Sequence, residues 1–447
     1  MKFFRLVIVF FFATVQVKGQ ISASKLPNII IILADDLGYG DLSYLGSKDI
    51  QTPNIDHLAQ SGMQFENFYA NSTVCSPSRA SLLTGKYPDM VGVPGVIRQF
   101  KHDSWGYLKE DAVMLPALLK KRGYTTAMIG KWHLGFEKPN LPNDKGFDFF
   151  KGFLADMMDD YYTHLRGGVN WMRFNEKEIN PEGHATDIFT DWSIEYLNHQ
   201  KKSNKPFFLY LSYNAPHFPI QPPASFLENV KTREPNLSEE RAKNVALIEH
   251  LDFSIGKLMK SLQENALDQN TLIFFLSDNG GSIPHAQTNG LLRGGKQDMY
   301  EGGIKVPAIC VWKNRISPNS KMTNPAMLMD IFPTISSITG FPMPIDIDGI
   351  NIYPSLVGEK QSTDKRYMYW VRREGGQHKG ESYYAMRYGN YKILQNTPNT
   401  PFQFFNIKDD AFEKNPLPSD TSRIFIDLLS HLKDQIRKAE KIPWQKK

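Results

Sequence analysis

The sequence predicts an α/β protein, with a layered domain on a mainly parallel sheet followed by a smaller antiparallel sheet and a terminal helix. Short apolar runs typical of buried strands alternate with helical patterns, as expected of a layered α/β domain. After about residue 355 the chain changes to short aromatic segments separated by turn-like stretches. The predicted strands of the first domain are residues 28–33, 125–130, 206–213, 271–277 and 306–312.

The clearest helical pattern lies between residues 238 and 265. Apolar side chains recur there along one stripe, as on a helix that packs one face against a core. The stripe consists of Val245, Ile248, Leu251, Ile255, Leu258 and Leu262. Strands that alternate with helices of this kind indicate a mainly parallel sheet.

The last part of the chain predicts a small antiparallel sheet with a helix after it. Residues 366–373, 382–394 and 402–407 are short and aromatic, and a final helix is expected at about residues 422–439. We therefore predict two domains. The first spans residues 24–358, and the second, an α+β domain, spans residues 359–447.

The N-terminus has the pattern of a secretory signal peptide, residues 1–19. Lys2 and Arg5 precede an apolar run from residue 6 to residue 15, which is too short for a membrane span. The mature chain is expected to begin near Gln20 and to be secreted or periplasmic. No later segment reaches 18 apolar residues, so we expect no membrane span.

Charge and cysteine content narrow the possible partners. The net charge of the 447 residues is +5, a mild bias, and no basic block resembles a nucleic-acid-binding arm. There are two cysteines. Cys310 lies in an apolar strand-like run and is expected in the core, whereas Cys75 lies in polar surroundings. A disulfide between them is the alternative that counting alone allows.

Chemically active side chains follow four of the predicted strands, at the point where each strand ends. In open α/β sheets, sites form beyond the carboxyl ends of the strands. Polar loops explain any one such case, but four cases together indicate a site. The residues are Asp35 and Asp36, Lys131 and His133, His217, and Asp278 and Asn279.

Three carboxylates and an amide in this set suggest a site for a hard cation. Oxygen donors of this kind suit Ca²⁺ or Mg²⁺, whereas zinc favours more histidine and cysteine. A cluster of carboxylates also needs a cation to offset its mutual repulsion. Helix capping remains the commoner reason for an adjacent pair such as Asp35 and Asp36.

Residues 74–85 predict a helix with a cysteine at its entrance. Ser76 is the expected N-cap, Pro77 the first helical residue and Gly85 the terminator. Cys75 would then lie where free N–H groups favour anions. A small buried thiol is the ordinary alternative for an isolated cysteine.

The stretch CSPSRASLLTGKYP, residues 75–88, resembles the signature of the type I sulfatases. LADDLGYGD, GKWHLG, APHFP, SDNGG and RGGKQDMYEGGIKVP resemble the same family in order and spacing, and the resemblance covers essentially the whole mature chain. It implies an alkaline-phosphatase-like fold, with a large mixed sheet sandwiched by helices and a small C-terminal antiparallel domain with a terminal helix.

The resemblance implies a sulfuric ester hydrolase that uses Ca²⁺, with Mg²⁺ as the alternative. A maturation enzyme would convert Cys75 to Cα-formylglycine, whose hydrate attacks sulfur. The implied metal ligands are Asp35, Asp36, Asp278, Asn279 and modified Cys75. The implied catalytic residues are Arg79 to hold the hydrate, His133 to take its proton, Lys131 and Lys296 to bind sulfate, and His217 to protonate the leaving alcohol.

Export, the mild positive charge and the many aromatic residues favour a sulfated mono-, oligo- or polysaccharide as substrate. The candidate substrate-binding residues are Arg98, His102, His164, His184, His285, Arg372, Arg373 and His378. Two alternatives remain open: a phosphodiesterase or phosphonate monoester hydrolase of the same superfamily, and a non-catalytic sulfated-glycan-binding protein. Near Ala155 and Asp156 the chain departs from the family pattern, so no catalytic residue is named there.

Overall fold

The computed structural model describes residues 26–363, 365–374, 379–419 and 422–445. The predicted signal peptide lies outside these residues. A ten-stranded mixed sheet forms the centre of the fold, in the order β13-β2-β12-β11-β1-β10-β4-β5-β8-β9. Its strands are β1 (Asn28–Ala34), β2 (Met63–Phe65), β4 (Thr125–Lys131), β5 (Phe149–Phe153), β8 (Met172–Phe174), β9 (Lys177–Glu178), β10 (Phe207–Ser212), β11 (Thr271–Ser277), β12 (Ala308–Trp312) and β13 (Ser320–Met322).

The four predicted strands that carry the polar side chains are neighbours in this sheet. β11, β1, β10 and β4 pair in parallel, and β12, the fifth predicted strand, pairs antiparallel with β11. Ala34 lies opposite Ser277, and Ser212 lies opposite Leu33 and Gly130. Because these strands end in register, the residues that follow them meet at one edge of the sheet.

Helices cover both faces of the sheet, because alternate residues of its buried strands point to opposite sides. Ile29 and Ile31 pack into one apolar cluster, and Ile30 and Ile32 pack into another. The first cluster includes residues of α2 (Cys75–Thr84), α3 (Leu115–Lys121) and α8 (Ile331–Thr339). The second includes residues of α1 (Pro53–Ser61), α4 (Ala185–Gln200), α5 (Ala224–Arg233) and α6 (Glu239–Glu264). The helix predicted for residues 238–265 is therefore confirmed as α6.

Short elements connect these layers. The short strands are β3 (Phe68–Tyr69), β6 (Leu165–Arg166), β7 (Val169–Asn170) and β14 (Ala326–Met327), and the short α-helices are α7 (Glu301–Ile304) and α9 (Tyr353–Leu356). The 3₁₀ helices are η1 (Ser43–Leu45), η2 (Pro88–Val91), η3 (Lys101–Asp103), η4 (Asp268–Asn270), η5 (Ile283–His285) and η6 (Leu328–Asp330). No helix among the described residues has the length and apolar character needed to cross a bilayer.

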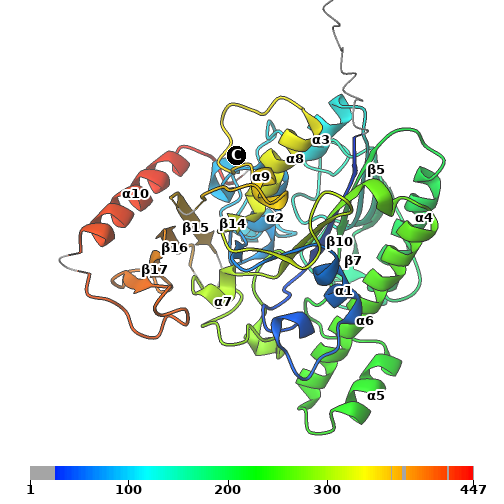
Figure 1. Ribbon diagram of the computed structural model, residues 1–447, viewed down its shortest axis with the longest axis horizontal. Coiled ribbons are helices and arrows are strands. Elements are labelled where there is room, and N and C mark those ends of the chain that lie inside the picture. Colours follow the sequence, from blue (N-terminus) through cyan, green and yellow to red (C-terminus); the bar gives the residue numbers. More distant parts are fainter. Residues whose placement is uncertain (1–25, 364, 375–378, 420–421, 446–447) are drawn as a thin grey trace, which may run out of the picture.

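The C-terminal part forms the predicted antiparallel sheet with a helix packed on it. The strands are β15 (Tyr367–Arg373), β16 (Ser382–Tyr388), β17 (Tyr391–Gln395) and β18 (Gln403–Asn406), and the helix is α10 (Arg423–Ala439). In Figure 1 the red α10 lies at the opposite end of the molecule from the green helices α4 and α6. The predicted fold class is confirmed. The boundary after residue 358 falls between α9 and β15 and stays a prediction.

A buried charge cluster ties the C-terminal sheet to the main sheet. The Lys392 side chain on β17 is fully buried and donates to Glu301 at 2.9 Å and to Glu413 at 2.8 Å. The backbone N–H of Glu301 also donates to Glu413, at 2.6 Å. Glu301 begins α7, directly after the loop that carries Lys296. The C-terminal sheet therefore holds one end of that loop.

The predicted start of α2 is wrong by two residues. The helix begins at Cys75 with Val74 in the N-cap position, so Ser76 lies inside the helix. The Ser76 hydroxyl instead accepts a hydrogen bond from the backbone N–H of Ile97, at 3.1 Å. The predicted end is confirmed, because Gly85 has φ 70°, in the left-handed region that favours glycine. Cys75 therefore belongs to the first turn.

Candidate active site

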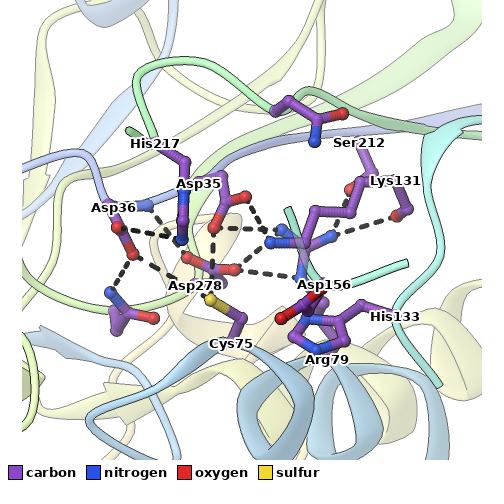
Figure 2. A network of polar contacts seen from close by, with 12 residues as sticks. Asp35, Asp36, Cys75, Arg79, Lys131, His133, Asp156, Ser212, His217 and Asp278 are labelled. Carbon is purple, nitrogen blue, oxygen red and sulfur yellow. Dashed lines mark hydrogen bonds and ion pairs between the residues drawn. The ribbon is translucent and has the colours of Figure 1, made fainter. Parts of the chain in front are cut away.

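The ends of four parallel strands and the start of α2 meet in one buried cluster, shown in Figure 2. Cys75 Sγ points from α2 toward the strand ends and lies 3.3 Å from Asp35 Oδ1 and 4.0 Å from Asp36 Oδ1. Cys75 is 3% exposed, and Cys310 is fully buried in the core at β12. Both cysteines are free, so the structure contains no disulfide between them.

The carboxylates of the cluster are matched by an equal number of fixed cations. The ion pairs are Lys131 to Asp35 at 2.5 Å, Lys296 to Asp36 at 2.7 Å and Arg79 to Asp278 at 2.7 Å. Burial alone would raise the pKa of Asp35, but the surrounding cations, Lys131 first among them, together outweigh it and hold this pKa below its ordinary value. Lys296 lowers the pKa of Asp36 in the same way, against the effect of burial. Both carboxylates are therefore ionised.

Arg79 joins three of the strand ends. Its guanidinium donates to Asp278 after β11, to the backbone carbonyl of Lys131 at 3.1 Å and to the hydroxyl of Ser212 at 2.5 Å. Sequence reasoning missed Ser212, which is the last residue of β10. Its position two residues before Asn214 was the available signal, because the strand end was already a site candidate. Arg79 thus fixes the strand ends relative to α2.

His133 presents one unpartnered nitrogen. Its Nε2–H donates to the carbonyl of Ile97 at 2.9 Å, whereas Nδ1 is buried and has no hydrogen-bond partner. Burial, helped by Lys131 and Arg79, lowers the pKa of His133 well below its ordinary value. Nδ1 of the neutral ring is therefore a free acceptor. His133 has φ 58° and Asp36 has φ 66°, a strained conformation of the kind that clusters at functional sites.

His217 and Lys296 form a hydrogen-bonded pair. His217 Nδ1 donates to the carbonyl of Phe218 at 2.6 Å, so its Nε2 accepts from the Lys296 ammonium at 3.0 Å. Burial and then the charge of Lys296 lower the pKa of His217 to about 4. The imidazole is therefore neutral near pH 7, and the proton of the pair resides on Lys296.

The donor set fits a hard divalent cation. Asp35, Asp36, Cys75 and His217 each offer a ligand atom within 4.8 Å of the others. Asn279 Oδ1 is buried without a hydrogen-bond partner, while its amide nitrogen donates to Asp36 at 2.7 Å. Burial and the charge of Asp35 raise the pKa of Asp278 to about 7, which shows how closely the carboxylates are crowded. Carboxylate and amide oxygens are the ligands that Ca²⁺ and Mg²⁺ prefer.

Above this cluster lies a cavity of about 350 Å³ that includes Cys75, His133, His217 and Lys296 in its lining. Of the predicted substrate-binding residues, Arg98 and Arg372 also line it. Four charged residues that sequence reasoning had not assigned to the site are part of the same wall: Asp103, Asp156, Arg166 and Glu374. Arg166 binds Asp156 at 2.9 Å and Arg98 binds Glu374 at 3.0 Å. The outer wall is therefore made of paired charges.

The other predicted substrate-binding residues lie elsewhere. His102 lines a neighbouring cavity, and His285 stacks on Phe218 with ring centroids 4.2 Å apart. His164 and His184 are buried and bond the carbonyls of Gly183 and Gln221, so packing accounts for both rings. Arg373 lies over the ring of Trp444 at 4.7 Å. His378 falls outside the described residues.

Comparison with known protein families agrees with this geometry. A family model described as sulfatase matches residues 27–341, most of the chain. The chain belongs to the sulfatase family. A second model, described as the C-terminal part of N-sulphoglucosamine sulphohydrolase, matches residues 295–441. The chain is thus a type I sulfatase of the alkaline phosphatase superfamily, a sulfuric ester hydrolase.

Individual relatives resemble this sulfatase along most of its length. N-acetylgalactosamine-6-sulfatase of Canis lupus familiaris is 32% identical over 396 residues, which cover 84% of this chain and 72% of the relative. Arylsulfatase A of Bos taurus is 31% identical over 448 residues, which cover 93% and 84%. The crystal structure of Ps i-CgsB in complex with k-i-k-neocarrahexaose matches with a TM-score of 0.86 and 30% identity over 94% of each chain. The likeness therefore extends through both sheets.

Proposed function

We propose that this sulfatase removes sulfate from a sulfated saccharide, using Cα-formylglycine made from Cys75 and a bound Ca²⁺. The observation that carries the proposal is the position of Cys75 Sγ, 3.3 Å from Asp35 at the meeting point of the strand ends. Relatives named N-acetylgalactosamine-6-sulfatase, and a structure solved with neocarrahexaose, support a saccharide as the substrate class.

The environment of Cys75 supports its conversion. Burial, followed by the charge of Asp35, raises the pKa of the Cys75 thiol well above its ordinary value. A thiol that stays protonated is a poor nucleophile. A separate maturation enzyme would replace it with an aldehyde, whose hydrate supplies a hydroxyl nucleophile and a second hydroxyl for release of the sulfate.

Asp35, Asp36, Asp278, Asn279 and the modified Cys75 would hold the cation. When bound, Ca²⁺ would polarise a sulfate oxygen and favour ionisation of the attacking hydroxyl. The protein charges of the cluster already balance in three ion pairs. A divalent cation therefore leaves the site positive, and a site of this sign attracts a sulfate ester.

The cationic side chains and His133 have separate tasks. We assign Lys131 and Lys296 to the sulfate oxygens, where negative charge develops in the transition state, and the position of Lys296 in the cavity lining supports its part in this. Arg79 keeps the strand ends and Asp278 in place beside the hydrate. His133 Nδ1, a buried acceptor without a partner, takes the proton of the second hydroxyl when the sulfate is expelled.

Protonation of the leaving alcohol falls to the His217–Lys296 pair. His217 lines the cavity, and its Nε2 accepts a hydrogen bond from Lys296 at 3.0 Å. Once protonated at Nε2, the ring would donate that proton to the leaving oxygen, while Lys296 keeps its charge for the sulfate. A sugar alkoxide is a poor leaving group, so the transfer lowers the barrier to S–O cleavage.

A desulfation screen tests the proposal. The chain is produced in a host that has the maturation enzyme, and sulfate release is measured on defined mono- and oligosaccharide sulfates and on matched phosphate esters. We expect sulfate release that Cys75→Ala abolishes, and a Cys75 peptide about 18 Da lighter than its unmodified form. Activity from a preparation holding only free thiol would refute the modification. Faster release of phosphate would instead favour the phosphodiesterase alternative.

Export belongs to the same proposal. The predicted signal peptide, residues 1–19, supports a secreted or periplasmic enzyme. N-terminal sequencing of the protein recovered from an exporting host should begin near Gln20. A mature chain that retains Met1 would contradict this.

A further inference from the structure

A second cavity, of about 500 Å³, lies directly beside the active-site cavity. The same chain segments line both. Arg98 borders the two cavities, its neighbours Ile97 and Gln99 line only the second, and Leu134 and Gly135 line the second immediately after His133 lines the first. The two cavities have Arg98 in common and are otherwise lined by adjacent residues of the same segments, so they lie side by side.

The second cavity has the lining of a binding site for an uncharged, amphipathic ligand. Phe136 and Trp171 form an aromatic corner in it, with ring centroids 4.9 Å apart. The polar side chains of Gln99, Ser104 and Gln445 also line the cavity. Apolar walls with a few convergent polar groups, and a volume within about 300–1,000 Å³, are typical of ligand sites.

The charges of the cavity do not favour an anion. The Arg98 guanidinium binds Glu374 at 3.0 Å and lies 3.9 Å from Asp103, so its charge is already compensated. Glu137 lines the same cavity and adds a carboxylate. A sugar ring suits this lining, since its C–H faces pack on aromatic rings while its hydroxyls both donate and accept.

We propose that the second cavity binds an uncharged sugar unit attached to the sulfated unit held at the active site. The inference rests on the proposed function and narrows it, because the preferred substrate is then a disaccharide or longer chain. The sugar ring packs its C–H face on Phe136 and Trp171, which line the cavity. Arg98 lies between the two sugar units, because it lines both cavities.

The test compares matched substrates on the mature enzyme. The best monosaccharide sulfate of the screen, as its methyl glycoside, is compared with disaccharides that add either one neutral sugar or one uronic acid. We expect kcat/KM for the neutral disaccharide to exceed that for the monosaccharide by about tenfold, and the uronic acid to give no such gain. Trp171→Ala removes the ring face on which the sugar packs, and should reduce the neutral disaccharide's advantage by about fivefold.

Trp192→Ala is the matched control, because the Trp192 ring belongs to α4, packs near Phe189 and lines neither cavity. Equal kcat/KM for monosaccharide and neutral disaccharide in the wild type would overturn the inference while leaving the proposed function intact. An equal gain from the uronic acid, or an advantage that Trp171→Ala and Trp192→Ala change alike, would also overturn it. If no sulfated saccharide is hydrolysed while a nitrophenyl sulfate is, the proposed function fails and this inference fails with it.

Discussion

Replacing Lys392 with methionine should destabilise the protein strongly, although Lys392 lies outside the active site. Its ammonium is fully buried and makes charge-assisted hydrogen bonds of 2.9 and 2.8 Å to two carboxylates. Burial alone would raise the pKa of Glu301, but Lys392, with Arg387 and Lys305, lowers it to about 2. Methionine fills similar space without the charge. Removing one partner of a buried ion pair typically costs about 3–5 kcal/mol.

The loss of folding stability caused by Lys392→Met should be larger at high pH than at low pH, because of the carboxylates around Lys392. Burial already raises the pKa of Glu413 against the opposing charge of Lys392, and without that charge the pKa rises further. In the folded variant, Glu413 then stays protonated at pH values at which it has lost its proton in the unfolded chain. The stability of the variant is therefore retained at low pH and lost as pH rises through the folded pKa of Glu413. The deficit should be larger at pH 8 than at pH 5.

Urea unfolding followed by circular dichroism measures the free energy of unfolding at both pH values. The double variant Lys392→Met/Glu413→Gln is the control, because it removes the carboxylate left without a partner and keeps an acceptor for the Glu301 N–H. It should recover part of the loss at pH 8. A deficit below about 1 kcal/mol, the same deficit at both pH values, or a double variant no more stable than the single one would refute the reasoning.

Three further predictions concern buried acids and the active site. Burial raises the pKa of Asp89 to about 7, so its ionisation costs stability as pH rises; Asp89→Asn should unfold at higher urea than the wild type at pH 8, with a smaller difference at pH 5. The opposite trend would contradict the assignment. Asp35→Ala should lose bound Ca²⁺ in metal analysis and nearly all activity while its circular dichroism is unchanged; full activity of the wild type after exhaustive chelation would exclude a metal role. His217→Ala should slow sugar sulfate hydrolysis ~10²–10⁴-fold and nitrophenyl sulfate hydrolysis much less, since nitrophenol leaves without protonation. Equal losses on both substrates would move the acid role to Lys296.

The residues at the centre of the site could be predicted because the end of a strand can be recognised from the sequence. Parallel strands then place their ends together in the folded protein. Runs such as residues 271–277 mark buried strands, and parallel pairing in register brings the next residue of each to one edge. Asp35, Lys131 and Asp278 can therefore be grouped from the order of the residues alone. The long helix α6 is predictable for a similar reason, since its apolar stripe repeats over many turns.

Residues whose role depends on a distant partner could not be predicted in this way. Ser76 has the local signature of an N-cap, yet its hydroxyl binds the Ile97 N–H, 21 residues away. His164 and His184 were singled out by residue type, although their rings bond backbone carbonyls that only the folded loops bring close. Asp156 was left without a role because the stretch around it does not match the family pattern, and its partner Arg166 lies 10 residues further along the chain.

The burial of α2 decides when the enzyme can be activated. All ten residues from Cys75 to Thr84 are buried, and the segment is already helical. A modifying enzyme that needs to grip Cys75 and its neighbours can reach them only while the polypeptide is still extended. The proposed conversion must therefore precede folding, during synthesis or export. A molecule that folds with Cys75 unmodified can no longer be converted. The specific activity of a preparation would then depend on how fast Cys75 is converted relative to the rate of folding, as well as on the turnover rate of the mature site.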